Sequence, residues 1–194
     1  MPQQTRDPVI AAAQIVNALQ SIVARNVSPF QSAVISVTYF HAGDAYNVIP
    51  QTAEIRGTIR TFDTEVRDLV IQRFKDVVHN LSIAMDCTEK IELWMLTPAL
   101  VNHPEVTAFV GEIVRENGAT IVDSTYQTMA SEDMAEFLTE IPGCFMLVGS
   151  ANEDKGLNFA HHHPRFDFDE EVLINGTGWI CAAAIGLLEK QPSV

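Results

Sequence analysis

Cysteine is scarce in this 194-residue sequence, and the three residues present show no paired spacing. Cys87, Cys144 and Cys181 lie far apart, and no two of them form the CxxC pattern of a zinc or redox site. The sequence therefore gives no sign of a cysteine metal centre or a disulfide framework. Each cysteine lies in an apolar run, which predicts buried free thiols and a reducing, cytoplasmic location.

Positive charge is also in short supply, because 12 lysines and arginines face 25 aspartates and glutamates, giving a net charge of −13. Nucleic acids and anionic membranes both attract a basic face, so we expect neither as a partner. We expect no secretory signal, and no apolar run approaches the roughly 20 residues that span a bilayer. The 47% of hydrophobic residues is ordinary for a folded globular chain.

The first half of the chain alternates helical and extended patterns. A helix is predicted where Asp7 can act as a cap, Pro8 suits the first turn, and apolar residues recur on one face. β-Branched residues or strict alternation indicate the strands. The predicted order is helix 5–23, strand 32–40, strand 52–62, helix 64–85 and strand 90–96. This order matches a ferredoxin-like βαββαβ domain without its first strand, which leaves one place in the sheet unfilled.

The character of the sequence changes near residues 97–104, where we place a domain boundary. The elements predicted beyond it are helix 105–117, strand 119–123, helix 131–139, strand 144–150 and helix 171–189. Alternating strands and helices indicate part of an α/β layer. Two strands are too few to cover these helices, and the last helix is apolar enough to pack on a sheet. The fold class we expect is therefore α/β, with an α+β domain first.

Half of the six histidines stand in a row, in the stretch FAHHHPRFDFDEE. Neutral imidazole is a good ligand for zinc, manganese, cobalt or nickel, and a nearby carboxylate such as Asp167 or Asp169 could partner the ligand's second nitrogen. His161, His162 and His163 cannot all face one ion, so at most two of them would bind it. The alternative interpretation is a set of solvent-exposed loop histidines.

Four stretches, in order, are similar to the metal-dependent aminoacylase and carboxypeptidase family. They are MPQQTRDPVIAAAQIVNALQ, YNVIPQTAEIRGTIRTF, MASEDMAEFLTEIPGCFMLVGS and HHPRFDFDEE, and the resemblance extends over nearly the whole chain, from residue 1 to residue 171. The sequence most resembles hippurate hydrolases, N-acyl-amino-acid amidohydrolases, auxin-conjugate hydrolases and N-acetyl-diaminopimelate deacetylases. The resemblance implies hydrolysis of the amide bond of N-acyl amino acids with a divalent metal, namely zinc, manganese, cobalt or nickel.

The resemblance also implies a domain assignment. Residues 1–98 would form a ferredoxin-like lid, incomplete at its N-terminus, through which the protein would form a homodimer. Residues 99–194 would form the C-terminal part of the catalytic domain. His162 matches the first histidine of the family's HHP motif and would bind metal, whereas His161 occupies a position that is usually apolar in relatives.

Two lid residues match family positions that reach the substrate. Asn47 could hold a carbonyl or oxyanion through its amide, and Arg60 could bind a carboxylate through its guanidinium. The alternatives are a turn asparagine and a solvent-facing strand arginine. Ser131, Glu132 and Asp133 have a simpler interpretation as a helix N-terminus.

The family's remaining metal ligands and its glutamate general base are not found in this sequence. Metal-assisted amide hydrolysis needs a metal-bound water and a base, and a catalytic zinc usually has three protein ligands. One histidine does not provide this set, so no residue is assigned as catalytic. We therefore expect a partial amidohydrolase that is inactive alone. The alternatives are a non-catalytic dimerisation or binding module, and one half of a split enzyme.

Overall fold

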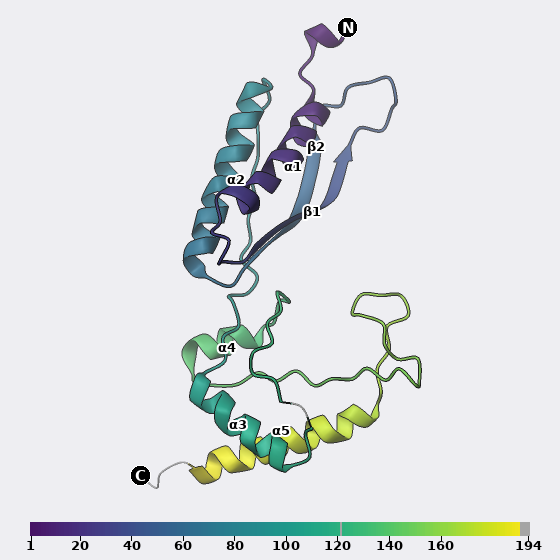
Figure 1. Cartoon of the computed structure of the whole chain (residues 1–194). Helices are drawn as coiled ribbons and strands as arrows, with labels where there is room; N and C mark the ends of the chain where they lie inside the picture. The colour runs from purple at the N-terminus through teal and green to yellow at the C-terminus, as the bar shows by residue number, and fades with distance from the viewer. Residues whose placement is uncertain (121, 191–194) are drawn as a thin grey trace. The chain divides into compact units, whose positions relative to one another are not determined.

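The computed structural model describes residues 1–120 and 122–190 and shows two compact units (Figure 1). Unit 1 comprises Met1–Ala99 together with the short segment Met129–Ser131. Unit 2 comprises the described residues of Leu100–Thr128 and Glu132–Val194.

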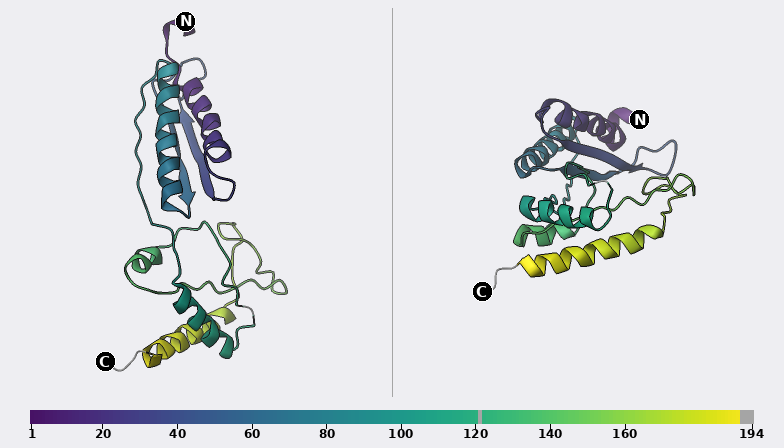
Figure 2. Two further views of the ribbon diagram at one scale, coloured as in Figure 1. Left: turned by 60° about the vertical axis from the view of Figure 1, so that its left-hand side comes forward. Right: turned by 60° about the horizontal axis from the view of Figure 1, so that its bottom comes forward.

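Unit 1 is an antiparallel hairpin covered on one face by two helices (Figure 2). Asp7 caps the first helix by accepting hydrogen bonds from the N–H groups of Val9 and Ile10, and Asp63 caps the second in the same way. The sequence predicts these helices and strands correctly. The elements are η1 (Pro2–Gln4), α1 (Pro8–Arg25), β1 (Ala33–Ala42), β2 (Ala53–Thr61) and α2 (Thr64–Ala84).

The core of unit 1 lies between the helices and the hairpin. Leu19 and Ile22 of α1 and Val70 of α2 are the largest fully buried side chains. Ile35 of β1 joins them from the sheet. Burying one such side chain stabilises a fold by about 1.5–3 kcal/mol, so this cluster gives unit 1 a core of its own.

A glycine allows the two strands to approach closely where their register shifts. β1 and β2 pair antiparallel, with an irregularity between Val37 and Tyr39 of β1. Gly57 of β2 lies opposite Val37, and a Cβ atom at Gly57 would collide with the carbonyl oxygen of Ser36. A side chain therefore cannot be added here without moving the backbone of β1.

The strand predicted at 90–96 is wrong as a paired strand. Within the described ranges, the sheet of unit 1 contains β1 and β2 alone. Ile91 nevertheless packs against the unit 1 core. A strand is defined by hydrogen bonds to a neighbouring strand, so the local sequence pattern is strand-like while the required neighbour is not supplied by this chain.

Unit 2 contains three helices joined by long irregular segments. α3 and α5 pack together around Val110, Val114 and Ala183, and Trp179 of α5 donates its Nε1–H to the carbonyl of Asn117 at 3.0 Å. The helices predicted at 105–117, 131–139 and 171–189 are thus present, with small changes at their ends. They are α3 (Pro104–Glu116), α4 (Met134–Glu140) and α5 (Glu171–Lys190).

The strands predicted at 119–123 and 144–150 are also not found as strands among the described residues, and residue 121 lies outside them. In place of a neighbouring strand, the side chain of Asn102 pairs with the backbone of Phe145. Its Nδ2 donates to the Phe145 carbonyl at 2.9 Å, and its Oδ1 accepts from the Phe145 N–H at 2.8 Å. Among the described residues, this extended segment therefore pairs with the Asn102 side chain and, at Ser150, with the Asp169 N–H, but not with a second strand.

Helix α5 is apolar on more than the face that it packs against α3. Trp179 and Ala183 lie toward the unit 2 core, whereas five aliphatic side chains are each more than half exposed, namely Leu173, Ile174, Ile180, Ile185 and Leu188. By length and composition, Glu171–Glu189 is able to cross a membrane, which corrects the expectation that no apolar run is long enough. A helix that is apolar all round is normally covered on all sides.

The cysteines also differ from expectation. Cys181 on α5 is exposed, and Cys87 and Cys144 are half-buried, so the prediction of buried thiols is wrong. The apolar helix around Cys181 is exposed where no other described residue of unit 2 packs against it. Cys181 lies on the same helix as the five exposed aliphatic residues, which explains its exposure.

Candidate functional site

The histidines lie in a loop of residues 150–169, here named the histidine loop, whose ends are tied together. Near its start, Asn152 and Leu157 form a short antiparallel bridge with two backbone hydrogen bonds of 2.8 Å. Gly156 closes the turn between them with a φ of 71°. At the end of the loop, the Asp169 N–H donates to the carbonyl of Ser150 at 3.0 Å. This closure holds the histidine segment in a defined place in unit 2.

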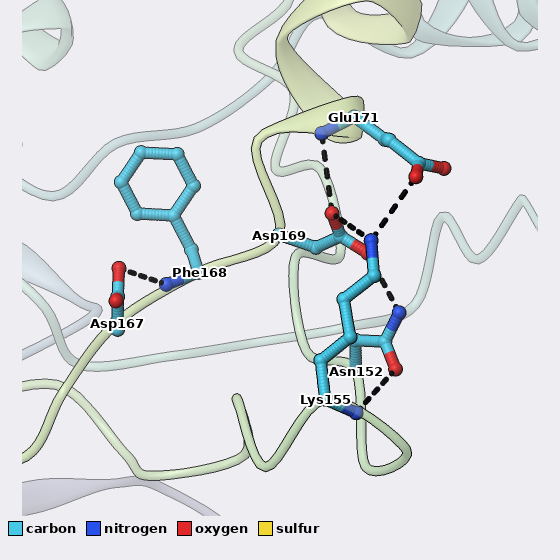
Figure 3. Close-up of polar contacts among 6 residues, drawn as sticks. All are labelled: Asn152, Lys155, Asp167, Phe168, Asp169 and Glu171. Atoms are coloured by element: carbon cyan, nitrogen blue, oxygen red, sulfur yellow. Dashed lines mark hydrogen bonds and ion pairs between the residues drawn. The ribbon is translucent and has the colours of Figure 1, made fainter.

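The carboxylate of Asp169 is the anchor of the loop (Figure 3). It accepts hydrogen bonds from Nδ2 of Asn152 at 2.6 Å and from Nζ of Lys155 at 2.9 and 3.0 Å. It also accepts a longer bond, at 3.3 Å, from the backbone N–H of Glu171 at the start of α5. Lys155 reaches the Glu171 carboxylate as well, at 3.0 Å. One carboxylate thus joins the start of the loop to the start of the last helix.

These contacts also shift the pKa values of Asp169 and Lys155 in the directions that favour their charged forms. The Asn152 amide first, and then the Lys155 ammonium, favour the ionised carboxylate and hold the pKa of Asp169 below its usual value. The two carboxylates of Asp169 and Glu171 raise the pKa of Lys155. Asp169 is therefore committed to structural contacts. Asp167 points elsewhere, accepting from the Phe168 N–H at 2.9 Å (Figure 3). In the described structure neither aspartate has a hydrogen bond or ion pair with a histidine ring, which differs from the partnership suggested by the sequence.

The three adjacent histidines have different surroundings. The ring of His163 stacks on Phe159 at 4.6 Å between centroids, and its Nδ1 accepts from the Arg165 N–H at 3.1 Å. The ring of His161 meets Phe166 edge to face at 4.7 Å. Among the described contacts, the ring of His162 has neither a hydrogen bond nor an aromatic neighbour. His162 is exposed, and both of its ring nitrogens are without a hydrogen-bond partner among the described residues, as are those of His161 and the Nε2 of His163. His162 differs from its neighbours in that its ring also has no aromatic contact there.

The backbone of His162 is also unusual. Its φ of 66° lies in the left-handed region, which non-glycine residues adopt rarely and at some energetic cost. Turn hydrogen bonds from His163 N–H to the Ala160 carbonyl (3.1 Å) and from Phe166 N–H to the His163 carbonyl (2.9 Å) surround it. The turn therefore directs the middle histidine differently from its two neighbours, a difference that the sequence alone does not reveal.

Arg60 has a specific partner in unit 1. Its Nη1 donates to the carbonyl of Met129 at 2.8 Å, across 69 residues of sequence. A second contact of the same segment joins the hydroxyls of Thr97 and Ser131 at 2.8 Å. The side chain is half-buried and is not the freely solvated arginine of the alternative interpretation. One guanidinium N–H is used here, and an arginine has five, so further donors remain for a ligand.

Asn47 is placed far from Arg60 along the hairpin. Asn47 is exposed in the link between β1 and β2, which enters β2 at Ala53, whereas Arg60 is near the other end of that strand. The seven residue steps from 53 to 60 correspond to about 23 Å of strand. Next to Asn47, Tyr46 and Val48 are also highly exposed. The structure does not bring the two predicted substrate residues together within one chain.

Comparison with known proteins identifies the family of this chain. Residues 5–185 match peptidase family M20/M25/M40. The chain belongs to this family. It is 36% identical over 191 residues to the N-acetyl-L-cysteine deacetylase of Bacillus subtilis (strain 168), covering 98% of this chain and 44% of that protein. It is 31% identical over 190 residues to the hippurate hydrolase of Campylobacter jejuni, covering 97% of this chain and 48% of that protein.

A solved structure of the M20 family shares the fold. The YXEP protein of Bacillus subtilis, a dinuclear metal-binding peptidase, matches with a TM-score of 0.74 and 29% identity, covering 95% of this chain and 47% of that one. The predicted family and fold class are thereby confirmed, and the relatives point to a divalent metal in the M20 enzymes. This chain spans about half the length of the relatives that it matches.

The residues described here do not by themselves fit a metal centre. Across residues 1–120 and 122–190, no group of three or more His, Cys, Asp or Glu side chains is arranged to hold an ion. His162 can offer one nitrogen donor, and the carboxylate of Asp169 at the end of the same loop already accepts hydrogen bonds from Lys155 and Asn152. A stable site would need ligands in addition to those of this M20 chain.

Sequence reasoning missed three partners of functional candidates, two in unit 2 and one in unit 1. Lys155 and Asn152 hold Asp169, and the Met129 carbonyl receives Arg60. An asparagine and a lysine before a glycine read as an ordinary polar turn, so no local signal marks them. The contact of Arg60 joins residues 69 positions apart, and nothing in the local pattern at either end indicates it.

Proposed function

We propose that this chain is one part of a metal-dependent amidohydrolase that acts on N-acyl amino acids. Water would add to the acyl carbon as the C–N bond breaks, giving a carboxylate and a free amine. Support comes from the relatives, which are named as an N-acetyl-L-cysteine deacetylase and a hippurate hydrolase. The observation that carries the proposal is the exposed ring of His162, held in a left-handed turn between two histidines whose rings contact Phe166 and Phe159.

The proposed roles of this chain's residues follow from their chemistry. His162 would supply one of the ligands of the divalent metal in the complete enzyme. Arg60, with guanidinium donors left beyond its bond to Met129, would bind the substrate carboxylate, and Asn47 would bind the acyl carbonyl. Because these two residues lie at opposite ends of the hairpin, a homodimer through unit 1 would let Arg60 of one copy and Asn47 of the other share a substrate.

The chain alone is proposed to be inactive. Unit 1 would be the incomplete lid (1–98), and residues 99–194 would be a part of the catalytic domain. The exposed aliphatic side of α5 supports this, because a polypeptide corresponding to the rest of an M20 protein would cover it. We expect that polypeptide to bring the missing metal ligands and the general base. A cytoplasmic location and the lack of nucleic-acid or membrane partners complete the proposal.

A hydrolysis assay tests the proposal. The pure chain, supplied in turn with zinc, manganese, cobalt or nickel, is expected to release no benzoate from hippurate and no acetate from N-acetyl-L-cysteine. Adding the part of the Bacillus subtilis N-acetyl-L-cysteine deacetylase that this chain does not match is expected to produce metal-dependent release. Turnover by the chain alone would contradict the partial-enzyme proposal.

The second candidate is a non-catalytic dimerisation or binding module built on unit 1. The observation in its favour is the separate core of this unit, with Leu19, Ile22 and Val70 fully buried. Light scattering and metal analysis discriminate the two. A dimer that stays metal-free in the mixture favours the module, whereas co-purification with a polypeptide of similar size favours a split enzyme.

A further inference from the structure

The part of the histidine loop that carries His162 has few backbone hydrogen bonds. The ends of the loop are tied together, and residues 158–168 lie between these ties. Within that segment, the backbone–backbone hydrogen bonds are those that close two successive turns, Ala160–His163 at 3.1 Å and His163–Phe166 at 2.9 Å. Side-chain contacts therefore have to supply the remaining order of the segment.

The first turn places His162 where most side chains are unfavourable. Because the His163 N–H donates to the Ala160 carbonyl, His162 is the third residue of this turn. With a φ of 66°, it takes the position that glycine or asparagine usually occupies in a type II turn. Another residue keeps a left-handed backbone only when the contacts around it hold it there. The structure has to contain such contacts close to the turn.

The second turn is stiff because of its proline. Pro164 is the second residue of this turn, where the fixed φ of about −65° is favoured. The turn is further closed by the Arg165 N–H, which donates to Nδ1 of His163 at 3.1 Å. The two turns share His163, so a contact between the second turn and the residue that precedes the first turn restrains the first turn at both ends.

Phe159 makes that contact. The His163 imidazole stacks on the Phe159 ring with 4.6 Å between centroids and 13° between the planes. The guanidinium carbon of Arg165 lies 4.1 Å from the centroid of the same ring, within the range of a cation–π interaction. Phe159 is half-buried, whereas His163 and Arg165 are exposed. We name these three residues the phenyl clamp.

We propose that Phe159 is a positioning residue for His162. By holding His163 and Arg165 against its ring, Phe159 restrains the first turn and keeps the His162 backbone left-handed, which separates the middle imidazole from its two neighbours. Phe159 acts through the backbone of the turn. This inference rests on the proposed function in one respect, which is that His162 is a ligand of the metal.

The phenyl clamp needs an aromatic ring at position 159 more than it needs an imidazole at position 163. In His163→Asn, the amide oxygen can accept from the Arg165 N–H in place of Nδ1, as in an Asx turn. The contact between Arg165 and the Phe159 ring also remains in that variant. Phe159→Leu keeps an apolar side chain but removes the π face that both partners contact. We therefore expect a large effect at position 159 and a small one at position 163.

Nuclear magnetic resonance of the 194-residue chain without metal tests the phenyl clamp directly. A φ near +60° brings the amide proton of a residue closest to its own α-proton, so His162 is expected to show a strong nuclear Overhauser effect between these two protons. Phe159→Leu is expected to weaken this effect about threefold, because ordinary residues prefer a negative φ. Phe159→Tyr keeps the ring and is expected to retain the effect. An unchanged effect in Phe159→Leu overturns the proposal.

Phe168→Leu is the matched control. Phe168, drawn in Figure 3, is half-buried in the same loop, and its ring has no aromatic or cation–π contact among the described residues. The His162 signal is expected to be unchanged in this variant, and an equal loss in Phe168→Leu and Phe159→Leu contradicts the proposal. Circular dichroism checks the helices of each variant. Should Phe159→Leu lose them, Arg165→Gln at an exposed position decides instead, and a fully retained His162 signal there overturns the proposal.

Zinc affinity provides a second measurement. The chain is mixed with the part of the Bacillus subtilis N-acetyl-L-cysteine deacetylase that it does not match, and zinc is titrated into the mixture. Phe159→Leu is expected to weaken zinc binding about tenfold, as is typical of residues that orient a metal ligand. Phe159→Tyr and Phe168→Leu are expected to bind zinc like the unchanged chain. Equal zinc affinity in Phe159→Leu overturns the proposal.

The outcome for the proposed function is separate from the outcome for the phenyl clamp. A mixture of the unchanged chain that binds no zinc counts against the proposed function, and the His162 signal of the chain alone then decides the role of Phe159. A mixture that binds zinc equally well with Phe159→Leu keeps the proposed function and overturns the positioning role.

Discussion

Unit 1 and unit 2 are similar in length but differ in how much apolar surface they bury within the chain. In unit 1, α1, α2 and the hairpin enclose Leu19, Ile22 and Val70 completely. In unit 2, the buried core is limited to small side chains such as Val110 and Val114, and α5 leaves five aliphatic side chains exposed. The comparison teaches that the same residue types stabilise a fold only where the chain supplies a partner surface.

The largest expected effect contrasts two leucines in these regions. Leu19→Ala removes a side chain that is 1% exposed and is expected to lower the free energy of unfolding of unit 1 by about 3 kcal/mol. Leu188→Ala removes one that is 72% exposed on α5, and a change within about 0.5 kcal/mol is expected in the isolated chain. Urea denaturation followed by amide exchange of α1 and α5 measures both. Equal decreases in the free energy of unfolding for the two variants would contradict the difference in burial between unit 1 and unit 2.

A smaller effect is expected from glycine replacement. Gly57→Ala forces a Cβ atom against the Ser36 carbonyl and is expected to destabilise unit 1 by about 2 kcal/mol. Gly149→Ala in unit 2 adds a Cβ atom to open space and serves as the control, with an expected change within about 0.5 kcal/mol. Thermal unfolding of both variants checks this, and an unperturbed Gly57→Ala would mean that β1 and β2 approach less closely than described.

The smallest effect concerns the histidine loop of unit 2 and its dependence on pH. Because hydrogen bonds from Asn152 and Lys155 lower the pKa of Asp169, the contribution of its carboxylate is complete above the ordinary carboxyl pKa. That contribution is lost as the pH falls through the lowered folded value. The protection of the amides of residues 152–157, corrected for the intrinsic pH dependence of exchange, is therefore expected to fall only in acid. The raised pKa of Lys155 keeps its ammonium charged throughout this range.

A pair of variants isolates this contribution. Asp169→Asn is expected to quicken exchange at neutral pH and to flatten the acid dependence, because the carboxylate is removed. Asp167→Asn, whose carboxylate accepts only from the adjacent Phe168 N–H, is expected to leave both unchanged. If amide protection of residues 152–157 still falls in acid in Asp169→Asn, a group other than the Asp169 carboxylate holds the loop.

The elements of this fold were predictable where the signal is local. Asp7 and Pro8 mark the start of α1, and alternation around Ile55 and Ile59 marks β2, because caps and side-chain periodicity depend on neighbouring residues. The strands predicted at 90–96, 119–123 and 144–150 are wrong as paired strands for the opposite reason. Their pattern is local, but their pairing needs a neighbour that the described chain lacks.

The candidate site was predictable only through the family resemblance. FAHHHPRFDFDEE identifies a set of histidines, yet the distinction among them comes from the left-handed turn at His162 and the ring contacts of His161 and His163. The contacts of Arg60 with Met129 and of Asp169 with Asn152 join residues distant in sequence. Such contacts depend on the tertiary fold and have no local signature.

Metal content tests the central claim, that the middle imidazole of the triplet is a ligand contributed by one part of an M20 enzyme. The mixture of this chain with the unmatched part of the Bacillus subtilis deacetylase is dialysed against each candidate metal and analysed. His162→Asn, chosen because asparagine tolerates the left-handed backbone, is expected to lower bound metal at least tenfold. His161→Asn and His163→Asn are expected to retain it. Equal metal in all three variants, or loss with His163→Asn alone, would contradict the account.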